Sequence, residues 1–311
     1  MLITVQDFTG IYDYQPFMQE LREKAAKSAD IHWLDCTKIV GTDCYCDDDA
    51  IKEINELIDS AERSSDNNNN SNCAGKAPGI HFFDNGNYHY MSKHWTDRVQ
   101  EPFSLIVFDH HPDMQPPRFG GILSCGGWVK EVLDHNKFVQ NVVIIGVKDE
   151  LVETVREELS QSGEADILNK VTFITESKIL KEIPTGVYPG LRSGAGMTSN
   201  NSAIAIPNDY HLSSFVCSEP ASVLSSNLYI SIDKDALSTS FAITNWDQGS
   251  LSTTSLKSTI AKFAAGRKIL GIDICGERSR DFEGDEQHSI QDADALNNAL
   301  NCELLEFLQK L

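Results

Sequence analysis

Two short apolar segments of this chain each end abruptly in side chains that bind metal ions. Residues 104–113 read SLIVFDHHPD, and residues 228–235 read LYISIDKD. Apolar runs of this kind are typical of strands buried on both faces of a parallel sheet. Side chains that follow such strands gather at the carboxyl edge of the sheet. The two segments therefore predict one site with four carboxylates and two imidazoles, from Asp109, His110, His111, Asp113, Asp233 and Asp235.

Strand-like and helix-like patterns alternate along the chain. Apolar runs predict strands at 31–36, 79–84, 104–109, 141–147, 171–174, 228–233 and 268–274, and residues 2–7 are expected to add an edge strand. Helical patterns cover 16–28, 48–63, 88–97, 125–136, 150–160, 253–265 and 289–310. This alternation indicates an α/β fold: a three-layer α/β/α sandwich with a mainly parallel sheet, formed as one domain over residues 1–311.

The composition narrows the class of partner. A formal net charge of −20 argues against nucleic acid and against an anionic membrane, because both are polyanions, and it favours a small-molecule substrate. No run of about 18 apolar residues is present. The N-terminus lacks the basic region of a signal peptide, and the eight cysteines show no framework spacing, so we expect a cytoplasmic protein with reduced thiols. A homo-oligomer is compatible with this composition.

Two polar stretches interrupt the alternation of strands and helices. Residues 64–72 read SSDNNNNSN and are expected to form a mobile surface loop. Residues 190–208 are rich in Gly, Ser and Asn, and a loop of that length is either disordered or an active-site lid.

Side-chain alternation decides which residues of the two motifs face the same way. In extended chain Asp109, His111 and Asp113 share one side, while His110 points away and is expected to be packed or supporting. The two aspartates of the second motif likewise share a side, and Lys234 lies between them. Four carboxylates at one edge repel each other and raise their own pKa values. Two divalent cations would remove that repulsion, and the donor set suits two such ions better than one zinc.

These residues resemble a known family. Asp-x-His-x-Asp after one strand and Ser-x-Asp-x-Asp after a later one are similar to the motifs of the ureohydrolase superfamily (arginases, agmatinases and formiminoglutamases), whose fold is shared with histone-deacetylase-like amidohydrolases. The resemblance covers roughly residues 80–277, and residues 86–89 (GNYH) fit the position of a further ligand histidine. His81 and His94 are the alternatives to that histidine. The resemblance implies a metal shell of His89, Asp109, His111, Asp113, Asp233 and Asp235, with Asp109 and Asp233 bridging.

The resemblance also implies a cofactor and a mechanism. Ureohydrolases use a manganese pair and deacetylases a single zinc, and the oxygen-rich donor set favours two Mn²⁺ ions, with zinc or another divalent ion as the alternative. Two such ions share a bridging water and lower its pKa, and the hydroxide attacks the trigonal carbon of an amidine, guanidine or amide. Asp113 or Asp235 is the candidate to relay the proton to the leaving amine.

The residues expected to hold the substrate depart from the family pattern. Residues 123–128 read LSCGGW where ureohydrolases often have a His-Gly segment, and Ser238-Thr239 replaces a further Asp-Pro. Gly276 stands where the family has a glutamate that receives the guanidinium, with Glu277 one residue later. Arginine and agmatine are therefore not the expected substrates. The candidate substrate contacts are Glu277, Cys125 and Trp246.

Two other functions compete with a ureohydrolase-like enzyme. The Asp109-His110-His111 run resembles the signature of DHH phosphoesterases, which use manganese, but their earlier Asp-x-Asp-x-Asp-Gly motif has no counterpart, since 47–49 (DDD) does not end an apolar strand. The altered substrate residues also fit a catalytically silent protein that binds metal and acts through a partner surface. Turnover of a small amidine or amide would exclude the silent protein.

Overall fold

The structure is a computed structural model that describes residues 1–66, 79–116, 119–181, 224–282 and 287–311. The 190–208 segment and most of the 64–72 loop lie outside these residues, whereas 64–66 belong to the end of a helix. Among the helices described, none combines the length and the apolar character that crossing a membrane requires.

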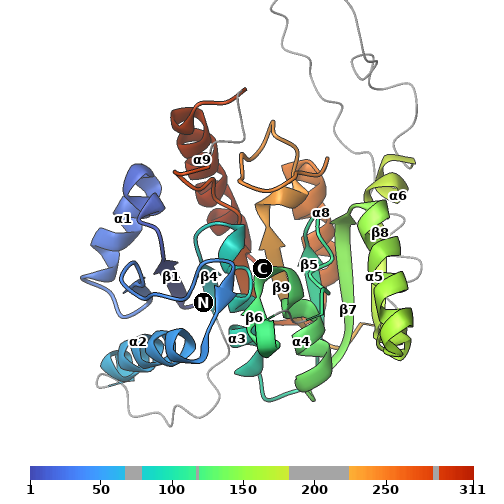
Figure 1. The fold of residues 1–311 in the computed structure, drawn as a ribbon. Coiled ribbons are helices and arrows are strands. Elements are labelled where there is room, and N and C mark those ends of the chain that lie inside the picture. Colours follow the sequence, from blue (N-terminus) through green and yellow to red (C-terminus); the bar gives the residue numbers. More distant parts are fainter. Residues whose placement is uncertain (67–78, 117–118, 182–223, 283–286) are drawn as a thin grey trace, which may run out of the picture.

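Eight parallel strands form one central sheet, as the sequence predicts. Their order is β2-β1-β4-β10-β9-β5-β7-β8 (Figure 1). The strands are β1 (Ile3–Asp7), β2 (Ile31–Asp35), β4 (Ile80–Phe82), β5 (Phe103–Phe108), β7 (Val139–Val147), β8 (Val171–Thr175), β9 (Asn227–Asp233) and β10 (Lys268–Cys275). The two motif strands, β5 and β9, are neighbours, and Phe108 pairs with Ile232. Asp109, which follows β5, and Asp233, the last residue of β9, therefore lie side by side at the edge of the sheet.

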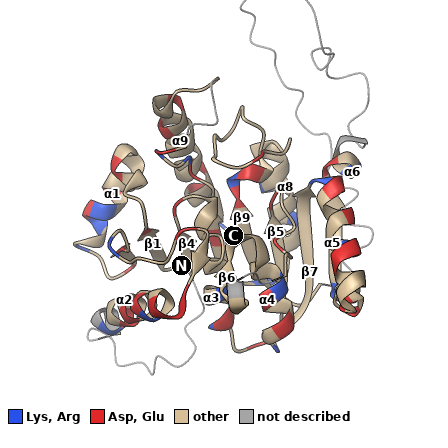
Figure 2. Cartoon of the chain, in the orientation of Figure 1, with Lys and Arg blue, Asp and Glu red and all other residues tan. Residues whose placement is uncertain are grey.

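Helices cover both faces of this sheet. They are α1 (Pro16–Ala25), α2 (Asp48–Asp66), α3 (Met91–Asp97), α4 (Trp128–His135), α5 (Asp149–Ser162), α6 (Glu176–Lys181), α8 (Thr253–Ala264) and α9 (Ile290–Leu308). In β5, Leu105 and Val107 pack into the core beneath α2 to α5, and Ile106 and Phe108 pack into the core beneath α1, α6, α8 and α9. This alternation confirms the three-layer α/β/α sandwich. Acidic residues are prominent along α2 and α5 (Figure 2).

Strand β1 differs from the expectation for residues 2–7. It was expected at the edge of the sheet, but it pairs with β2 on one side and β4 on the other, so β2 forms that edge. The polar residues Thr4 and Gln6 suggest a solvent-facing side, yet both are buried. The Gln6 side-chain oxygen accepts a hydrogen bond from Trp95 Nε1 at 2.8 Å, which offsets the cost of burying that oxygen.

A second, very small sheet was not expected from the sequence. Strands β3 (Tyr45–Cys46) and β6 (Leu123–Ser124) pair in antiparallel register. Two short turns are tighter than α-helix: η2 (Gly86–Tyr88) reaches the start of the helix expected at 88–97, and η4 (Cys125–Gly127) forms the start of the one expected at 125–136. Both short turns lie next to the carboxyl edge of the large sheet, where the 3₁₀ geometry redirects the chain before each helix begins.

A buried hydrogen-bonded group joins the centre of the sheet. Asp273 of β10 contacts His81 Nδ1 at 2.7 Å and accepts a hydrogen bond from the Tyr229 hydroxyl at 2.8 Å. The His81 ring also stacks on Trp95, with ring centroids 3.8 Å apart. His81, one of the alternatives to His89 as a ligand, is therefore committed to the core.

The Tyr229 hydroxyl allows a direct test of this group. Tyr229→Phe should lower the free energy of unfolding by about 1–3 kcal/mol, because a buried carboxylate loses one of its donors. Tyr14→Phe is the control, since that side chain is 55% exposed and should lose almost nothing. Urea unfolding followed by circular dichroism measures both variants, and equal losses would contradict the assignment.

Candidate metal centre

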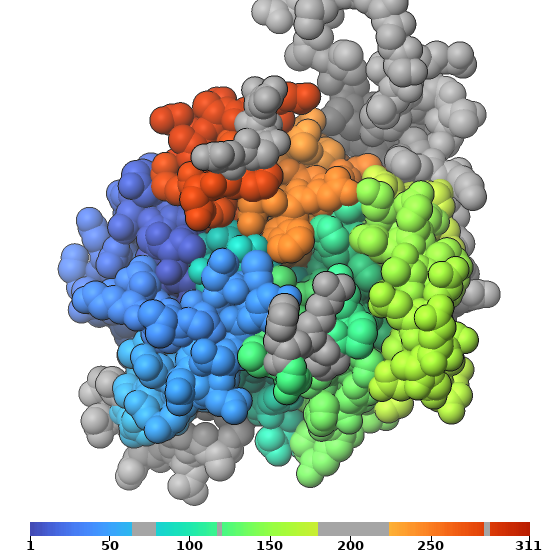
Figure 3. Space-filling model, in the orientation of Figure 1, coloured from blue at the N-terminus to red at the C-terminus, as the bar shows by residue number. Residues whose placement is uncertain are grey.

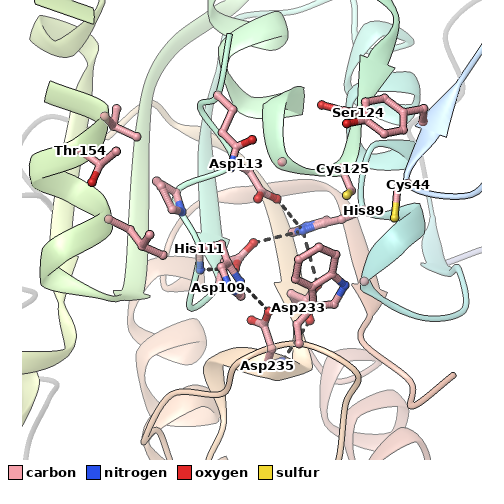
Figure 4. A pocket seen from close by; sticks show the side chains of 18 of the residues that line it. Cys44, His89, Asp109, His111, Asp113, Ser124, Cys125, Thr154, Asp233 and Asp235 are labelled. Atoms are coloured by element: carbon pink, nitrogen blue, oxygen red, sulfur yellow. Dashed lines mark hydrogen bonds and ion pairs between the residues drawn. The ribbon is translucent and has the colours of Figure 1, made fainter. Parts of the chain in front are cut away.

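The two aspartate motifs meet at the carboxyl edge of β5 and β9, where backbone amides fix the carboxylates (Figure 4). The His111 amide donates to Asp109 Oδ1 at 2.6 Å, and the His110 amide donates to Asp235 Oδ1 at 3.0 Å. Within the second motif, the Asp235 amide donates to Asp233 Oδ1 at 3.0 Å. These hydrogen bonds to the charged form hold the carboxylates in place although like charges surround them.

One cluster forms around His89, which follows η2. Its Nδ1 lies 3.0 Å from Asp113 Oδ2, 3.1 Å from Asp109 Oδ2 and 3.5 Å from Asp233 Oδ2. All four side chains are buried. His89 Nδ1 is thus surrounded by three carboxylate oxygens, and oxygen donors gathered around one position are what a hard divalent cation needs.

A second cluster lies on the other side of Asp109. His111 Nδ1 is 2.9 Å from Asp235 Oδ2 and 3.5 Å from Asp109 Oδ1. Asp109 therefore places one oxygen in each cluster. The donor atoms of Asp109, His111 and Asp235 lie within 4.8 Å of one another, as do those of His89, Asp109 and Asp113. Nitrogen and oxygen donors in two adjoining groups fit a pair of divalent ions.

Neighbouring side chains orient the donors. His89 Nε2 lies 2.8 Å from the Ser231 hydroxyl, which in turn lies 2.9 Å from the Ser92 hydroxyl. Trp128 Nε1 donates to Asp113 Oδ2 at 2.7 Å. A hydrogen bond on the far nitrogen of a ligand histidine fixes the ring and its tautomer. The sequence suggested no such contact for Trp128, whereas Ser231 belongs to the Ser-x-Asp-x-Asp motif and, two residues before Asp233, shares its side of the strand.

The raised pKa values of two histidines and one aspartate show that the site favours bound positive charge. Burial alone lowers the pKa of His111, but its hydrogen bonds with Asp109 and Asp235 outweigh burial and raise that pKa to about 12. The pKa of His89 is likewise raised well above its usual value by its aspartate partners, against the effect of burial. Burial, followed by the charge of Asp235, raises the pKa of Asp233 to about 7. Divalent cations would compete with protons for these side chains.

Glu277, expected as a substrate contact, has a different position in the structure. It does not line the cavity: it is buried and paired with Lys234, the residue between the two aspartates of the second motif. Its carboxylate also accepts hydrogen bonds from Gln15 Nε2 and Asn301 Nδ2, both at 2.8 Å. The Glu277 carboxylate is thus engaged by three buried partners, which explains why it does not reach the cavity.

Gly276 occupies a position that excludes any side chain. Its φ is +95°, in the left-handed region that favours glycine. A Cβ atom there would lie 2.4 Å from Asp233 Oδ1 and 2.7 Å from the Lys234 backbone nitrogen. The place of the expected guanidinium-binding carboxylate is therefore filled by the carboxylate of Asp233 and by the backbone that follows.

A cavity of about 370 Å³ opens over the two clusters. Cys125 and Trp246, both expected as substrate contacts, line it, as do residues 151, 154, 155 and 158 of α5. Trp246 stays in place through its Nε1, which donates to Asn87 at 2.9 Å, and its ring meets the His111 ring edge-on. Figure 3 shows that the N-terminal (blue), central (green) and C-terminal (orange and red) parts of the chain meet on one face of the molecule.

The remaining candidates lie outside this constellation. His110 Nδ1 contacts the Gly146 carbonyl at 3.2 Å, so it packs away from the clusters as predicted. His94, the other alternative to His89, is buried on α3, and burial lowers its pKa to about 3. In the 47–49 segment, Asp47 accepts a hydrogen bond from the Ala50 amide at the start of α2. That contact explains this acidic run as a helix cap.

Comparison with known proteins places this geometry in context. No protein-family model matches the chain. An uncharacterized protein of Thermotoga maritima is 25% identical over 278 residues, 88% of this chain and 79% of that protein. The fold is similar to the agmatine ureohydrolase of Thermoplasma volcanium (TM-score 0.55, 13% identity, 99% of this chain and 90% of that one). It is also similar to the arginase of Bacillus caldovelox, with a TM-score of 0.54 at 14% identity, over 96% of this chain and 97% of that one.

A third solved structure, the proclavaminate amidino hydrolase of Streptomyces clavuligerus, has a TM-score of 0.54 at 17% identity, over 98% of this chain and 91% of that one. Together these similarities confirm that the chain has the ureohydrolase fold. At such low sequence identity they establish the fold and leave the substrate to be argued from the site itself.

The Gly276 backbone yields a second prediction. Gly276→Ala should destabilise the protein by more than the roughly 1–2 kcal/mol that a left-handed backbone costs an ordinary residue, because its Cβ also approaches Asp233. Gly266→Ala is the matched control: its φ is +72° and no atom lies within 4 Å of the added Cβ. Urea unfolding compares the two variants. A similar loss in both would show that the contact with Asp233 is relieved without cost.

Proposed function

We propose that this chain is a dinuclear metal-dependent hydrolase that cleaves a non-peptide C–N bond, in an amidine, a guanidine or an amide of a small metabolite. The observation that supports this most directly is Asp109, whose two oxygens face His89 and His111 in different clusters. A carboxylate in that position is suited to bridge two ions. The ureohydrolase fold, found in solved structures named as arginase and amidino hydrolase, supports the same reaction class.

Each set of residues has a distinct task in this proposal. Two divalent ions would supply a water of lowered pKa and would polarise the trigonal carbon of the substrate. We favour manganese because the donors are four carboxylates and two imidazoles, with zinc as the alternative. Asp113 and Asp235 are the proposed proton carriers. Both line the cavity, and Asp113 is the more exposed of the two, at 7% against 2%.

The cavity supports a small substrate. Its volume of about 370 Å³ lies in the range typical of sites for small molecules. The acidic charge of the chain disfavours polyanionic partners, so we propose a small metabolite as the partner, in a cytoplasmic setting.

Binding of a guanidinium group is disfavoured by two features of the last strand. Gly276 has no room for a carboxylate, and Glu277 is already paired with Lys234. A buried guanidinium without a carboxylate partner costs several kcal/mol. We therefore propose an amidine- or amide-bearing metabolite rather than arginine or agmatine. A silent protein that binds metal through the same clusters is the competing proposal, and it predicts no turnover of any such compound.

The metal proposal predicts about two divalent ions per chain after reconstitution with Mn²⁺, measured by inductively coupled plasma mass spectrometry. Asp109→Ala should lose both ions because its carboxylate is shared, whereas His89→Ala should lose chiefly one. Removal of the metal by a chelator should also lower the melting temperature, since a ligand of the folded state stabilises it.

Asp247→Ala provides the control for these variants. That carboxylate lies near the site, 3.8 Å from His110 Nε2, but belongs to neither cluster, so both ions should remain. Loss of one and the same ion in Asp109→Ala and His89→Ala would refute a bridging role for Asp109.

The substrate proposal is tested by release of urea or ammonia from a panel of amidines, guanidines and N-acyl amines. Arginine and agmatine should be hydrolysed very slowly or not at all, and at least one other amidine or amide should be turned over by the manganese-loaded enzyme. Urea release from arginine at an ordinary enzyme rate, on the order of 10 per second, would overturn this prediction. Glu277→Gln would then show whether Glu277 changes partner to receive the substrate.

A further inference from the structure

Two cysteines stand side by side at one end of the small β3–β6 sheet. The register pairs Tyr45 with Ser124, and Cys44 and Cys125 are the next residues beyond this pair. The Cys125 amide donates to the Cys44 carbonyl at 2.9 Å, so the two backbones touch directly at the cysteines. A disulfide needs such a close approach, because it spans Cα separations of only about 4.4–6.8 Å.

The two thiols also meet at the wall of the cavity, where Cys44 is partly exposed and Cys125 is buried. Both residues line the cavity over the metal clusters, and Figure 4 shows their sulfur atoms on the same wall. A hydrogen bond between the thiols lowers the pKa of Cys44 and raises that of Cys125. Cys44 is thus the thiol that more readily becomes the attacking thiolate.

Cys46, two residues further along β3, is in a different environment. Cys44 has a φ of 57°, which interrupts the regular alternation of side chains along the strand. Cys46 is buried in the core, and burial raises its pKa to about 12. The chain therefore offers a matched cysteine that stands two residues from Cys44 but is buried in the core.

We propose that Cys44 and Cys125 form a reversible disulfide in the cavity wall, made by exchange with a low-molecular-weight disulfide. The Cys44 thiolate attacks one sulfur of the small disulfide, which forms a mixed disulfide and releases one thiolate. The Cys125 thiol then loses its proton and attacks the Cys44 sulfur, which releases the second thiolate. One small disulfide is reduced to two thiols, and the two protein thiols are oxidised to one disulfide.

The bridge would act on the part of the wall that holds Asp113. The Val129 amide donates to the Asp113 carbonyl at 3.0 Å, and the Gln115 amide donates to the Gly126 carbonyl at 2.9 Å. Cys125 lies inside this hydrogen-bonded segment, so a covalent link to Cys44 would tie Asp113 indirectly to β3. The shape of the cavity and the freedom of one candidate metal ligand would then depend on the redox state of the pair.

Equilibration of the full chain with oxidised and reduced glutathione tests the proposal. After alkylation of free thiols and proteolysis, mass spectrometry should show a peptide that links Cys44 to Cys125, and dithiothreitol should remove it. Oxidation should also raise the melting temperature, because a link between distant positions restricts the unfolded chain. In Cys44→Ser both effects should vanish.

Cys46→Ser is the control and should keep both the linked peptide and the rise in melting temperature. The wild-type peptide map decides the question even if a variant folds poorly. The proposal is overturned if no Cys44–Cys125 peptide forms at any glutathione ratio, whether the thiols stay free, stop at mixed disulfides or resist alkylation in the native protein. Cross-links distributed equally among Cys36, Cys46 and Cys125 would overturn it as well.

Discussion

Repulsion among four buried aspartates is the constraint around which this edge of the sheet is built. Asp109 and Asp233 emerge from adjacent central strands, and Asp113 and Asp235 follow them within a few residues. No arrangement of neutral side chains would hold so many carboxylates together in a buried place. The protein counters their charge with backbone amides aimed at individual oxygens and with two imidazoles placed between them.

The same constraint explains the surroundings of the site. Lys234 stands between the two aspartates of the second motif, yet its ammonium is paired with Glu277 rather than with the clustered aspartates. This buried pair keeps a cation that could compete with metal ions away from the donors. Ser231 and Trp128 then fix the orientation of a histidine and a carboxylate that would otherwise be free to turn. A buried ion pair is weak evidence for stability, and here we interpret it as positioning.

Much of this architecture could be predicted from sequence because its signals are local. Each motif directly follows an apolar strand, so its carboxylates reach the carboxyl edge of the sheet without knowledge of the rest of the chain. The backbone turns at Asp113, whose φ is 48°, so the alternation of an extended strand does not by itself explain where that side chain lies. The position of Glu277 could not be found in this way, because it depends on a positive φ at Gly276 and on partners at Gln15 and Asn301.

Contacts between residues far apart in sequence are also hard to predict from local patterns. The contact between Cys44 and Cys125 requires a two-residue ladder between strands far apart in sequence, and segments that short carry no periodic signal. The place of strand β1 inside the sheet likewise depends on its pairing with both β2 and β4, which its own residues do not reveal.

The close approach at Gly276 has a consequence for how this scaffold could change its chemistry. A glutamate introduced there would have to displace Asp233, a candidate ligand, before its own carboxylate could reach the cavity. A guanidine-specific descendant is therefore not one substitution away. The backbone after β10 and the loop after β9 would have to move together, so single substitutions on that route would disturb the candidate metal ligands first. Laboratory evolution that starts from libraries covering both segments at once would avoid that barrier.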